Sequence, residues 1–292
     1  MKFPLNPSIR SLLEMSLKED IGKRDLTTEA LVPRHTCGGA FITAKAPGVL
    51  AGLPLVKRVY AVLDRSVRVS FLKKDGEVVR PGVRIAKIQG SLRSILTGER
   101  VALNFLGHLS GIATLTSRFV AKAEPYGTKI MDTRKTLPSY RALQKYAVRC
   151  GGGANHRMSL YEAVMVKDNH LGAIGYDWDK LHRSLRKIRP RPVIVEVDRL
   201  SFLPKVISLH PRVILLDNMS VRQLKKAVRL VRKSGNRILL EASGRVDLKR
   251  VRDLAKAGVD RISVGALTHS APHLDFSLEV VSKCPYDVRP VG

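Results

Sequence analysis

Short apolar runs alternate with longer amphipathic segments from Thr128 onward, and this alternation limits the folds open to the chain. Each run is apolar and strand-sized, and the segments between runs are long enough for right-handed helical crossovers. Six such units in about 140 residues predict a parallel α/β barrel, either complete or incomplete. The runs are Lys129–Met131, Ala163–Val166, Val193–Val195, Val213–Leu216, Ile238–Leu240 and Arg261–Val264.

The first 110 residues follow another pattern, which predicts helices and a small antiparallel β layer. An amphipathic helix is expected from Pro7 to about Gly22, because apolar residues recur there at helical spacing. The other expected elements are strands at 38–45 and 48–52, a short helix at 55–63, alternating strands and turns over 67–90, and a helix over 91–123.

The formal charge of +27 comes from 52 Lys and Arg residues against 25 Asp and Glu. Such a balance attracts nucleic acids, acidic membrane surfaces and anionic metabolites alike, so it does not choose a partner. Much of the excess lies at helical spacing in segments 181–191 and 221–233, which predicts solvated outer helix faces. Aromatic residues make up only 5% of the chain, so a nucleic-acid-binding surface with stacking platforms is not favoured.

The cysteines indicate a reducing compartment. Cys37, Cys150 and Cys284 are widely spaced and form no CxxC pair, so neither a disulfide framework nor a zinc site is predicted. The first twenty residues have no long apolar core or small-residue cleavage site, and no later run reaches transmembrane length. We therefore expect a cytoplasmic protein with no membrane association.

Polar residues directly follow the apolar runs. Because the carboxyl ends of parallel strands meet at one edge of a sheet, we expect these residues to share one mouth of the barrel. They are Thr133, Arg134, Lys135, Lys167, Asp168, Glu196, Asp217, Asn218, Glu241, Ser243, Gly244 and Gly265.

These residue types suit a phosphorylated sugar and a second anion. Glycine turns offer backbone N–H groups to phosphate. The carboxylates of Glu196 and Asp217 can accept hydrogen bonds from ribose hydroxyls and hold Mg²⁺ on a diphosphate. Cations around the Gly151–Gly153 break can bind carboxylates, Arg in a bidentate manner; they are Arg134, Lys135, His156, Arg157 and Lys167.

Each side chain also has a plain structural explanation. Arg134 can be part of an exposed loop, His156 a helix-end cap and Glu196 a surface acid. Asp132 and Asp168 fit loop caps or residues that orient neighbouring cations better than reactive acids. Other histidines lack the spacing of a metal site; they are His170, His269 and His273.

Several segments, in order, resemble quinolinate phosphoribosyltransferase, the carboxylating nicotinate-nucleotide diphosphorylase family. The resemblance covers nearly the whole chain, and so many motifs in the family's order are highly specific. The segments are EDIGKRDLTTE (19–29), GERVALNFLGHLSGIAT (98–114), DTRKTLPSYRALQKYAV (132–148), GGGANHR (151–157), VKDNH (166–170), VEVD (195–198), LLDNM (215–219), EASG (241–244) and GVDRISVGALTHSAPHLDFSL (258–278).

The resemblance implies an N-terminal α/β sandwich, residues 1–110 with 271–292 returning to it, and an open α/β barrel over 111–270. It also implies the reaction. Quinolinate and 5-phosphoribosyl 1-diphosphate give nicotinate mononucleotide, diphosphate and CO₂, with Mg²⁺ and no organic cofactor. A homodimer or larger assembly is implied too, in which Arg100 reaches the neighbouring active site.

The family's site residues carry over onto matching positions of this sequence. Arg134, His156, Arg157 and Lys167 are implied to face quinolinate, with Lys135 near the diphosphate. Glu196 and Asp217 are implied to bind ribose hydroxyls and Mg²⁺, and with Lys135 and Lys167 they form the implied catalytic set. The remaining implied substrate-binding residues, mostly around the 5-phosphate, are Thr133, Ser243, Gly244, Arg245, Val264, Gly265 and Ala266.

Two departures from the family pattern are visible. Arg245 stands where the family usually has a small residue, and Ala154 stands where a polar residue is common. Two other hypotheses therefore stay open beside the quinolinate enzyme. One is a sibling of the same fold, similar to the protein of molybdate transport operons, with another substrate. The other is a non-catalytic basic barrel that binds RNA or DNA.

Overall fold

The computed structural model describes residues 3–4, 7–188 and 190–281. The chain forms two compact units. The first comprises Met1–Leu115, Pro138–Gly151 and Ala271–Gly292, and the second comprises Thr116–Leu137 and Gly152–Ser270. The first unit thus takes in residues 138–151, which lie within the stretch assigned to the barrel from the sequence. The domain limits expected from the sequence stay a prediction.

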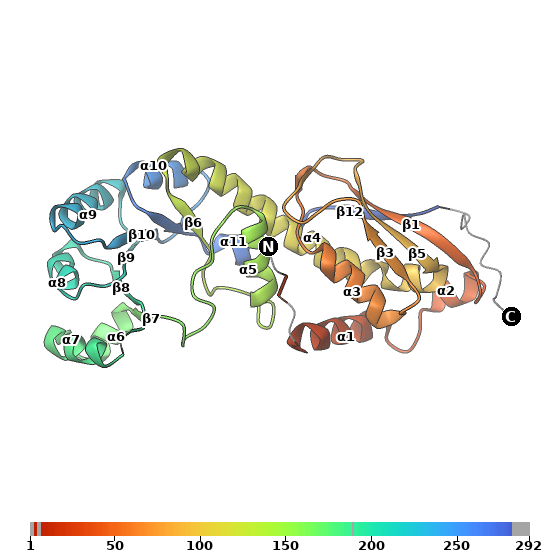
Figure 1. Ribbon diagram of the computed structural model, residues 1–292, viewed down its shortest axis with the longest axis horizontal. Helices are drawn as coiled ribbons and strands as arrows, with labels where there is room; N and C mark the ends of the chain where they lie inside the picture. Colours follow the sequence, from red (N-terminus) through yellow and green to blue (C-terminus); the bar gives the residue numbers. More distant parts are fainter. Residues whose placement is uncertain (1–2, 5–6, 189, 282–292) are drawn as a thin grey trace. The chain divides into compact units, whose positions relative to one another are not determined.

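The first unit is built on an antiparallel sheet with strand order β12-β1-β5-β3 (Figure 1). Its strands are β1 (Cys37–Ala44), β3 (Arg68–Phe71), β5 (Arg84–Ser91) and β12 (Phe276–Val281), and β2 (Gly48–Val49) pairs separately with β4 (Val78–Val79). Its helices are α1 (Pro7–Ile21), α2 (Leu26–Leu31), α3 (Leu53–Leu63) and α5 (Arg141–Cys150), and α4 (Leu92–Ala123) begins here and continues into the second unit.

The sequence predicted helices α1, α3 and α4 and the antiparallel strands, but not helices α2 and α5. Helix α1 buries Ile9, Leu13 and Leu17, and the chain leaves it at Gly22 with φ +58°, a left-handed conformation that glycine adopts at little cost. The antiparallel layer over 67–90 and the helix over 91–123 are both present. Cys37 and Cys150 are free thiols, while Cys284 lies outside the described residues. Among the described helices, none has the length and apolarity needed to cross a membrane.

Asp25 is the N-cap of helix α2, and its side chain accepts hydrogen bonds from Thr28 N (3.0 Å) and Thr97 Oγ1 (2.9 Å). These bonds, those from Thr28 first, lower the pKa of Asp25. Asp25→Ala is expected to lower the free energy of unfolding by about 1 kcal/mol at neutral pH. Because the folded pKa is depressed, this stability is present above the unfolded pKa and is lost as the pH falls through the folded one.

Denaturant unfolding at neutral and acidic pH measures the effect. The matched control is Asp25→Asn, because asparagine caps a helix equally well but does not titrate. The alanine variant should differ from wild type at neutral pH and approach it in acid, whereas the asparagine variant should stay close to wild type at neutral pH. An alanine variant as stable as wild type at neutral pH would contradict the capping role.

The second unit is an open parallel sheet with strand order β6-β11-β10-β9-β8-β7. All of its pairings are parallel, as the alternating runs predicted. The strands are β6 (Lys129–Met131), β7 (Val164–Val166), β8 (Val193–Val197), β9 (Val213–Asp217), β10 (Leu239–Ser243) and β11 (Arg261–Ser263). Strands β6 and β7 are the two edges, so the sheet does not close into a full barrel.

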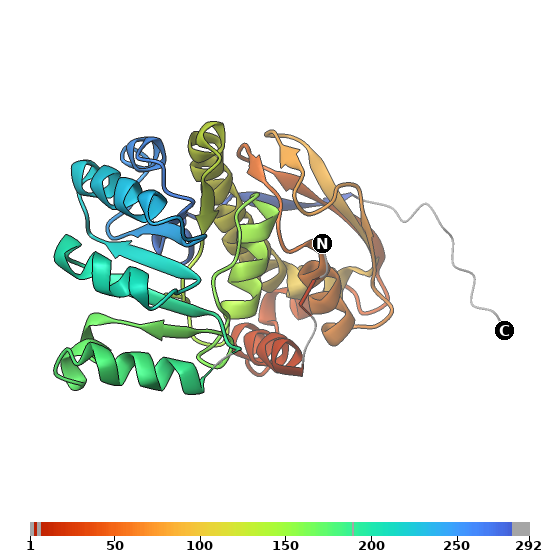
Figure 2. The ribbon, with the colours of Figure 1, turned by 60° about the vertical axis from the view of Figure 1, so that its left-hand side comes forward.

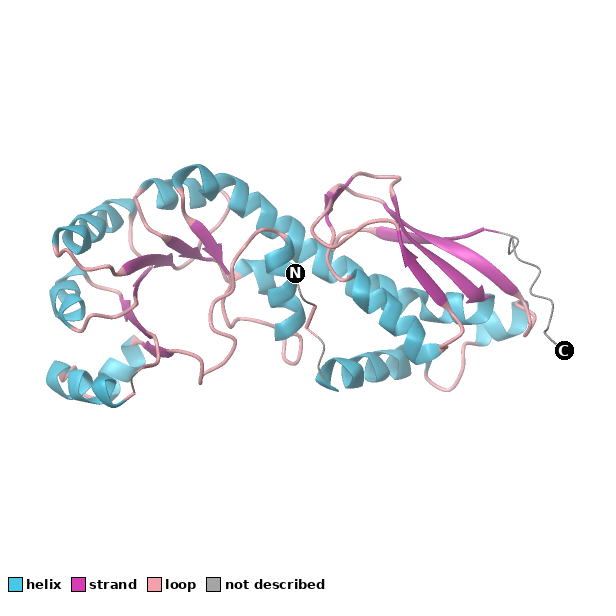
Figure 3. Cartoon of the chain, in the orientation of Figure 1, coloured by secondary structure: helices cyan, strands magenta, loops and turns pink. Residues whose placement is uncertain are grey.

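Helices cover the outer face of this sheet (Figures 2 and 3). They are α6 (Asp168–Ala173), α7 (Trp178–Lys187), α8 (Leu203–Ser208), α9 (Val221–Lys233) and α10 (Val251–Lys256). The short helix α11 (Ala266–His269) follows β11, and 3₁₀ turns lie at Glu124–Tyr126 and Leu200–Phe202. Helix α9 buries Leu224, Ala227 and Val231 and exposes most of its basic side chains. This confirms the prediction of a solvated basic face.

Candidate active site

A cavity of about 640 Å³ lies at the carboxyl end of the parallel sheet. All of its lining residues belong to the second unit. They are Thr133, Arg134, Lys135, His156, Arg157, Met165, Lys167, Glu196, Leu215, Asp217, Ser243, Gly244, Arg245, Val246, Ser263, Gly265, Ala266 and His269. The residues expected at a common mouth of the barrel are thus largely brought together, because each follows a parallel strand.

One wall of the cavity is cationic. Arg157 is held by a hydrogen bond from Nη1 to the carbonyl oxygen of Ala163 (2.9 Å), and the Nε atoms of Arg134 and Arg157 are buried without a hydrogen-bond partner among the described residues. Burial, and secondly the Arg134 guanidinium, lower the pKa of Arg157. The two guanidinium groups repel each other, and each has a buried N–H donor without a protein acceptor in the described part of the chain. Both features favour the binding of an anionic ligand at this wall.

Asp132 fixes the loop that carries this wall. It is fully buried at the end of β6 and accepts hydrogen bonds from His156 N (2.8 Å) and Asn155 Nδ2 (2.5 Å). Ala154 forms a parallel bridge with Met131, so segment 152–157 is docked along the edge strand β6. Asp132 therefore orients its neighbours rather than facing a ligand, the role favoured for it from the sequence.

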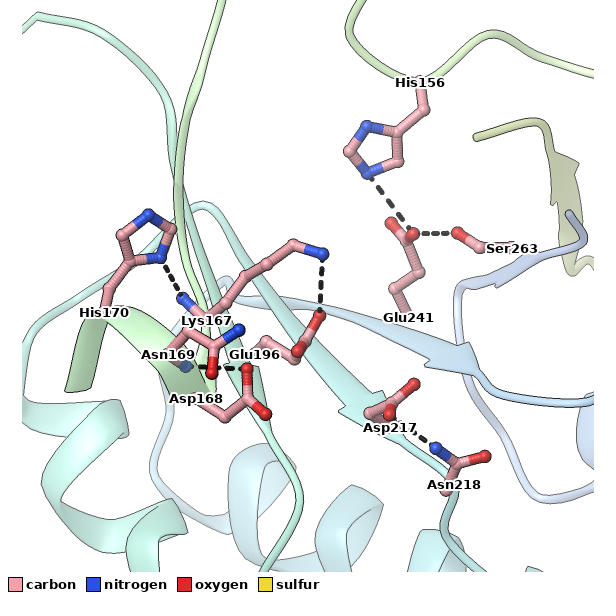
Figure 4. A network of polar contacts seen from close by, with 10 residues as sticks. All are labelled: His156, Lys167, Asp168, Asn169, His170, Glu196, Asp217, Asn218, Glu241 and Ser263. Carbon is pink, nitrogen blue, oxygen red and sulfur yellow. Dashed lines mark hydrogen bonds and ion pairs between the residues drawn. The ribbon is translucent and has the colours of Figure 1, made fainter. Parts of the chain in front are cut away.

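The opposite wall is acidic. Lys167 Nζ lies 3.8 Å from Glu196 Oε2, and the Glu196 side chain is only 16% exposed (Figure 4). Asp217, at the end of β9, accepts a hydrogen bond from Asn218 Nδ2 (2.6 Å). Burial raises the pKa of Glu196, and the nearby carboxylates Asp217, Asp168 and Asp198 add to the rise against the opposing Lys167 charge. Acids that repel one another in this way favour a cation between them.

The raised pKa of Glu196 predicts an acidic limb in the pH profile. Deprotonation of Glu196 occurs at higher pH than for a free glutamate, so ligands that need its carboxylate should be lost as pH falls through the raised pKa. Asp198→Asn removes one repelling charge and is expected to move the acidic limb of kcat/KM to lower pH. Rate measurements from neutral to mildly acidic pH test this, and a limb that stays in place would assign it to another group.

Two glycine turns form the floor of the cavity. Gly244 has φ +96° and is followed by Arg245 with φ +45°, a left-handed conformation that is unfavourable for a branched or long side chain. This backbone gives a physical reason for the small residue that the family usually has at the position of Arg245. At the second turn, Thr268 Oγ1 donates to the carbonyl oxygen of Lys135 (2.7 Å), which fixes the Lys135 loop beside Gly265 and α11.

Gly244→Ala is expected to disrupt the first turn. A Cβ atom there would lie 2.8 Å from the backbone nitrogen of Asn218, and the positive φ would add strain. We expect kcat/KM for the phosphate-bearing substrate to fall about 100-fold. Steady-state kinetics with the second substrate at saturation measures it. Gly172→Ala is the control, since a Cβ there meets nothing within 4 Å; equal losses in both variants would exclude a specific role for the Gly244 turn.

Two residues implied by the resemblance lie outside the cavity lining. Val264 is 1% exposed and belongs to the core, where its N–H donates to the carbonyl oxygen of Met131 (2.9 Å). Arg100 lies on α4 in the first unit, and 63% of its side chain is exposed. The role of each in binding stays a prediction.

The sequence pattern did not point to several residues of the site. Five of them line the cavity: Met165, Leu215, Val246, Ser263 and His269. A sixth is Glu241, which was expected at a strand end but without a role; it is fully buried in β10 and contacts Ser263 and His156. The available signal was a lone carboxylate inside the otherwise apolar strand Leu239–Ser243.

Comparison with protein families assigns both parts of the chain. Residues 25–110 match the quinolinate phosphoribosyl transferase N-terminal domain, and residues 112–279 match the quinolinate phosphoribosyl transferase C-terminal domain. These two matches cover most of the chain.

Curated relatives and solved structures agree with the family models. The chain is 42% identical over 271 residues to a probable carboxylating nicotinate-nucleotide pyrophosphorylase of Synechocystis, covering 92% of this chain and 91% of the relative. It is 41% identical over 278 residues to the enzyme of Mycobacterium leprae, covering 93% and 96%. The crystal structure of NadC from Streptococcus pyogenes matches with a TM-score of 0.90 and 38% identity over 96% of this chain and 99% of that one. The chain therefore belongs to the quinolinate phosphoribosyltransferase family.

Proposed function

We propose that the cavity of the second unit is where the chain carries out the reaction of its family. The reaction transfers the phosphoribosyl group of 5-phosphoribosyl 1-diphosphate to quinolinate with loss of CO₂, giving nicotinate mononucleotide and diphosphate for NAD biosynthesis. It is a pentosyltransferase reaction without an organic cofactor. The observation that carries the assignment of the site is the pairing, in one cavity, of a cationic wall with an acidic wall above two glycine turns.

Quinolinate, a dicarboxylate, is proposed to bind at the cationic wall of Arg134 and Arg157, where His156 and Lys167 also face it. Buried guanidinium donors without protein partners support this assignment, because a carboxylate supplies the acceptors they lack. The pyridine nitrogen then attacks C1 of the ribose while the bond to diphosphate breaks. Lys135, on the loop beside Gly265, is proposed to bind the leaving diphosphate.

Glu196 and Asp217 are proposed to bind the ribose hydroxyls and Mg²⁺. Among the described residues, no three His, Cys, Asp or Glu side chains gather where a metal ion could bind, so these two carboxylates would share the ion with diphosphate oxygens and water. The raised pKa of Glu196 supports the fit, because a cation there relieves the repulsion among neighbouring carboxylates. When bound, Mg²⁺ neutralises charge on the leaving diphosphate. Thr133, Ser243, Gly244, Arg245, Val264, Gly265 and Ala266 are proposed to surround the phosphates.

Decarboxylation follows from the product of the first step. Ribosylation makes the pyridine nitrogen cationic, so the electron pair left at the adjacent carbon by departing CO₂ is stabilised as an ylide and then takes a proton. The protein has to orient both carboxylates and keep the departing one in a desolvated place, which the half-buried Arg134 and Arg157 can do. We further propose a cytoplasmic homodimer, or a larger assembly, in which Arg100 completes the partner's site.

The test is turnover of the purified protein with quinolinate, 5-phosphoribosyl 1-diphosphate and Mg²⁺, with nicotinate mononucleotide and CO₂ measured together. We expect equal amounts of both products from wild type and neither from Arg134→Ala. Turnover that is unchanged in the variant would move the quinolinate site elsewhere. No product from wild type would contradict the proposed function itself.

A further inference from the structure

Glu241 is a buried carboxylate with few partners. It lies in the middle of β10 between β9 and β11, and none of it is exposed. Ser263 Oγ donates a hydrogen bond to Glu241 Oε1, while Oε2 is buried and has no hydrogen-bond partner among the described residues. Burying a carboxylate is unfavourable unless its interactions compensate, and an apolar residue would suit this strand better. The placement therefore suggests a role beyond packing.

The other neighbour of Glu241 is His156. Its ring nitrogen Nε2 lies 3.4 Å from Glu241 Oε1, and the side chain of His156 is only 7% exposed. Figure 4 shows the imidazole and the Ser263 hydroxyl directed at the same carboxylate oxygen. Glu241, Ser263 and His156 thus form a buried group beside the cationic wall, since both Ser263 and His156 line the cavity.

The second ring nitrogen of His156 determines where the proton lies. Nδ1 is 2.9 Å from the backbone nitrogen of Arg157, whose N–H can only donate, so Nδ1 is the acceptor and carries no proton. The proton of the ring is then on Nε2, the atom that faces Glu241. The imidazole is therefore uncharged, and both of its nitrogens are directed at protein groups rather than at a ligand.

We propose that Glu241 is a positioning residue that holds His156 in the uncharged, Nε2-protonated form with its ring fixed along the quinolinate wall. Ser263 keeps the carboxylate in place, while the Asp132 carboxylate holds the backbone of His156 and the Arg157 N–H holds Nδ1. His156 then presents ring carbons to the pyridine ring, and the two carboxylates of quinolinate are left to the cationic wall. This inference rests on the proposed function of the cavity.

The first test needs no substrate. Nitrogen NMR of ¹⁵N-histidine-labelled protein, with the His156 signals assigned by their loss in His156→Gln, reports the proton on each ring nitrogen. Wild type is expected to show a protonated Nε2 and a bare Nδ1 at neutral pH. A doubly protonated ring, or a proton on Nδ1, would overturn the proposal whether or not the protein turns over quinolinate.

The second test compares two replacements of Glu241. Glu241→Gln keeps the oxygen that accepts from Ser263 and faces His156 Nε2, whereas Glu241→Leu has similar size and no acceptor. We expect the leucine variant to fold with stability equal to or above wild type, because apolar replacement of a buried charge is typically neutral or stabilising. Its kcat/KM for quinolinate should nevertheless fall about 100-fold, since a misplaced ring costs positioning.

Recovery by glutamine separates positioning from charge. Glu241→Gln is expected to keep the Nε2-protonated form of His156 and to regain most of the loss seen with leucine, with the KM for the phosphoribosyl donor within about 3-fold of wild type in both variants. If the folded leucine variant has the wild-type His156 spectrum and wild-type kcat/KM for quinolinate, Glu241 does not position His156. If wild type shows the expected His156 spectrum but turns over no quinolinate, the proposed function is contradicted, while the proposed protonation of His156 beside Glu241 is still supported.

Discussion

Arg134→Ala is expected to lower kcat/KM for quinolinate by about 1000-fold, because truncating one member of a buried, hydrogen-bonded charge pair costs roughly 2–5 kcal/mol. The Nε of Arg134 is buried and has no hydrogen-bond partner among the described residues. This N–H group is therefore available to donate a hydrogen bond to a ligand. The loss should therefore appear with quinolinate and leave protein stability nearly unchanged. Initial rates with quinolinate varied, at saturating 5-phosphoribosyl 1-diphosphate and Mg²⁺, measure it.

The neighbouring Arg157 sharpens this expectation. Since the Arg134 charge helps to lower the pKa of Arg157, removing Arg134 relieves repulsion and should slightly favour the folded state. The matched control is Arg222→Ala, the same change on the exposed face of α9, which should leave kinetics unaltered. If Arg134→Ala instead weakened only the binding of the phosphoribosyl donor, Arg134 would belong at the phosphates and not at quinolinate.

Asp217→Asn is expected to lower kcat/KM for 5-phosphoribosyl 1-diphosphate by about 100- to 1000-fold and to raise the Mg²⁺ concentration needed for half-maximal rate. Asp217 lies at the end of β9, and its charge contributes to the raised pKa of Glu196. The variant should consequently show a lower pKa for Glu196 together with weaker binding of the metal–diphosphate. Titrations of rate against Mg²⁺ at several substrate concentrations measure both effects.

A carboxylate on the outside of the same unit provides the comparison. Asp253→Asn on α10 makes the same change of charge at an exposed position, so its rates and Mg²⁺ dependence should match those of wild type. If Asp217→Asn alters only the KM for quinolinate, the carboxylate does not serve the ribose or the metal. If it changes nothing, the acidic wall has no part in binding.

The strand-end residues could be predicted from the sequence because a parallel sheet leaves little freedom. Once a run such as Val213–Leu216 is assigned to a buried strand, the next polar residue, Asp217, must lie at its carboxyl end beside those of the neighbouring strands. The same reasoning placed Glu196 and Lys167. Local sequence pattern and sheet topology lead to the same residues here, so many of the cavity-lining residues could be predicted from the sequence.

Other features depend on contacts that local pattern does not contain. Val264 and Gly265 are consecutive, yet Val264 is buried in the core while Gly265 lines the cavity. Successive residues of a strand point to opposite sides, so a one-residue error in the predicted end of a strand exchanges the residues assigned to the core and to the cavity. The role of Glu241 depends on Ser263 and His156, which come from distant segments. The grouping of residues 138–151 with the first unit is likewise a long-range result.

The strand order of the two sheets also affects how the chain can fold during synthesis. In the second unit, β7, β8, β9 and β10 can pair one after another as they emerge, but the strand that neighbours β6 in the sheet is β11, which is made much later. In the first unit, β1 pairs with β5 early and with β12 only after more than 180 further residues have been made. Such distant pairings slow folding, because loop closure precedes the contacts that stabilise it.

Arg134 and Lys135, which follow β6, therefore cannot reach their final positions until Arg261–Ser263 has left the ribosome. A nascent chain halted before that point contains nearly every residue of the cavity but lacks the strand that holds its first edge. The strands that complete the two sheets, β11 and β12, come late in this sequence, so a product that ends before β11 has neither sheet in full.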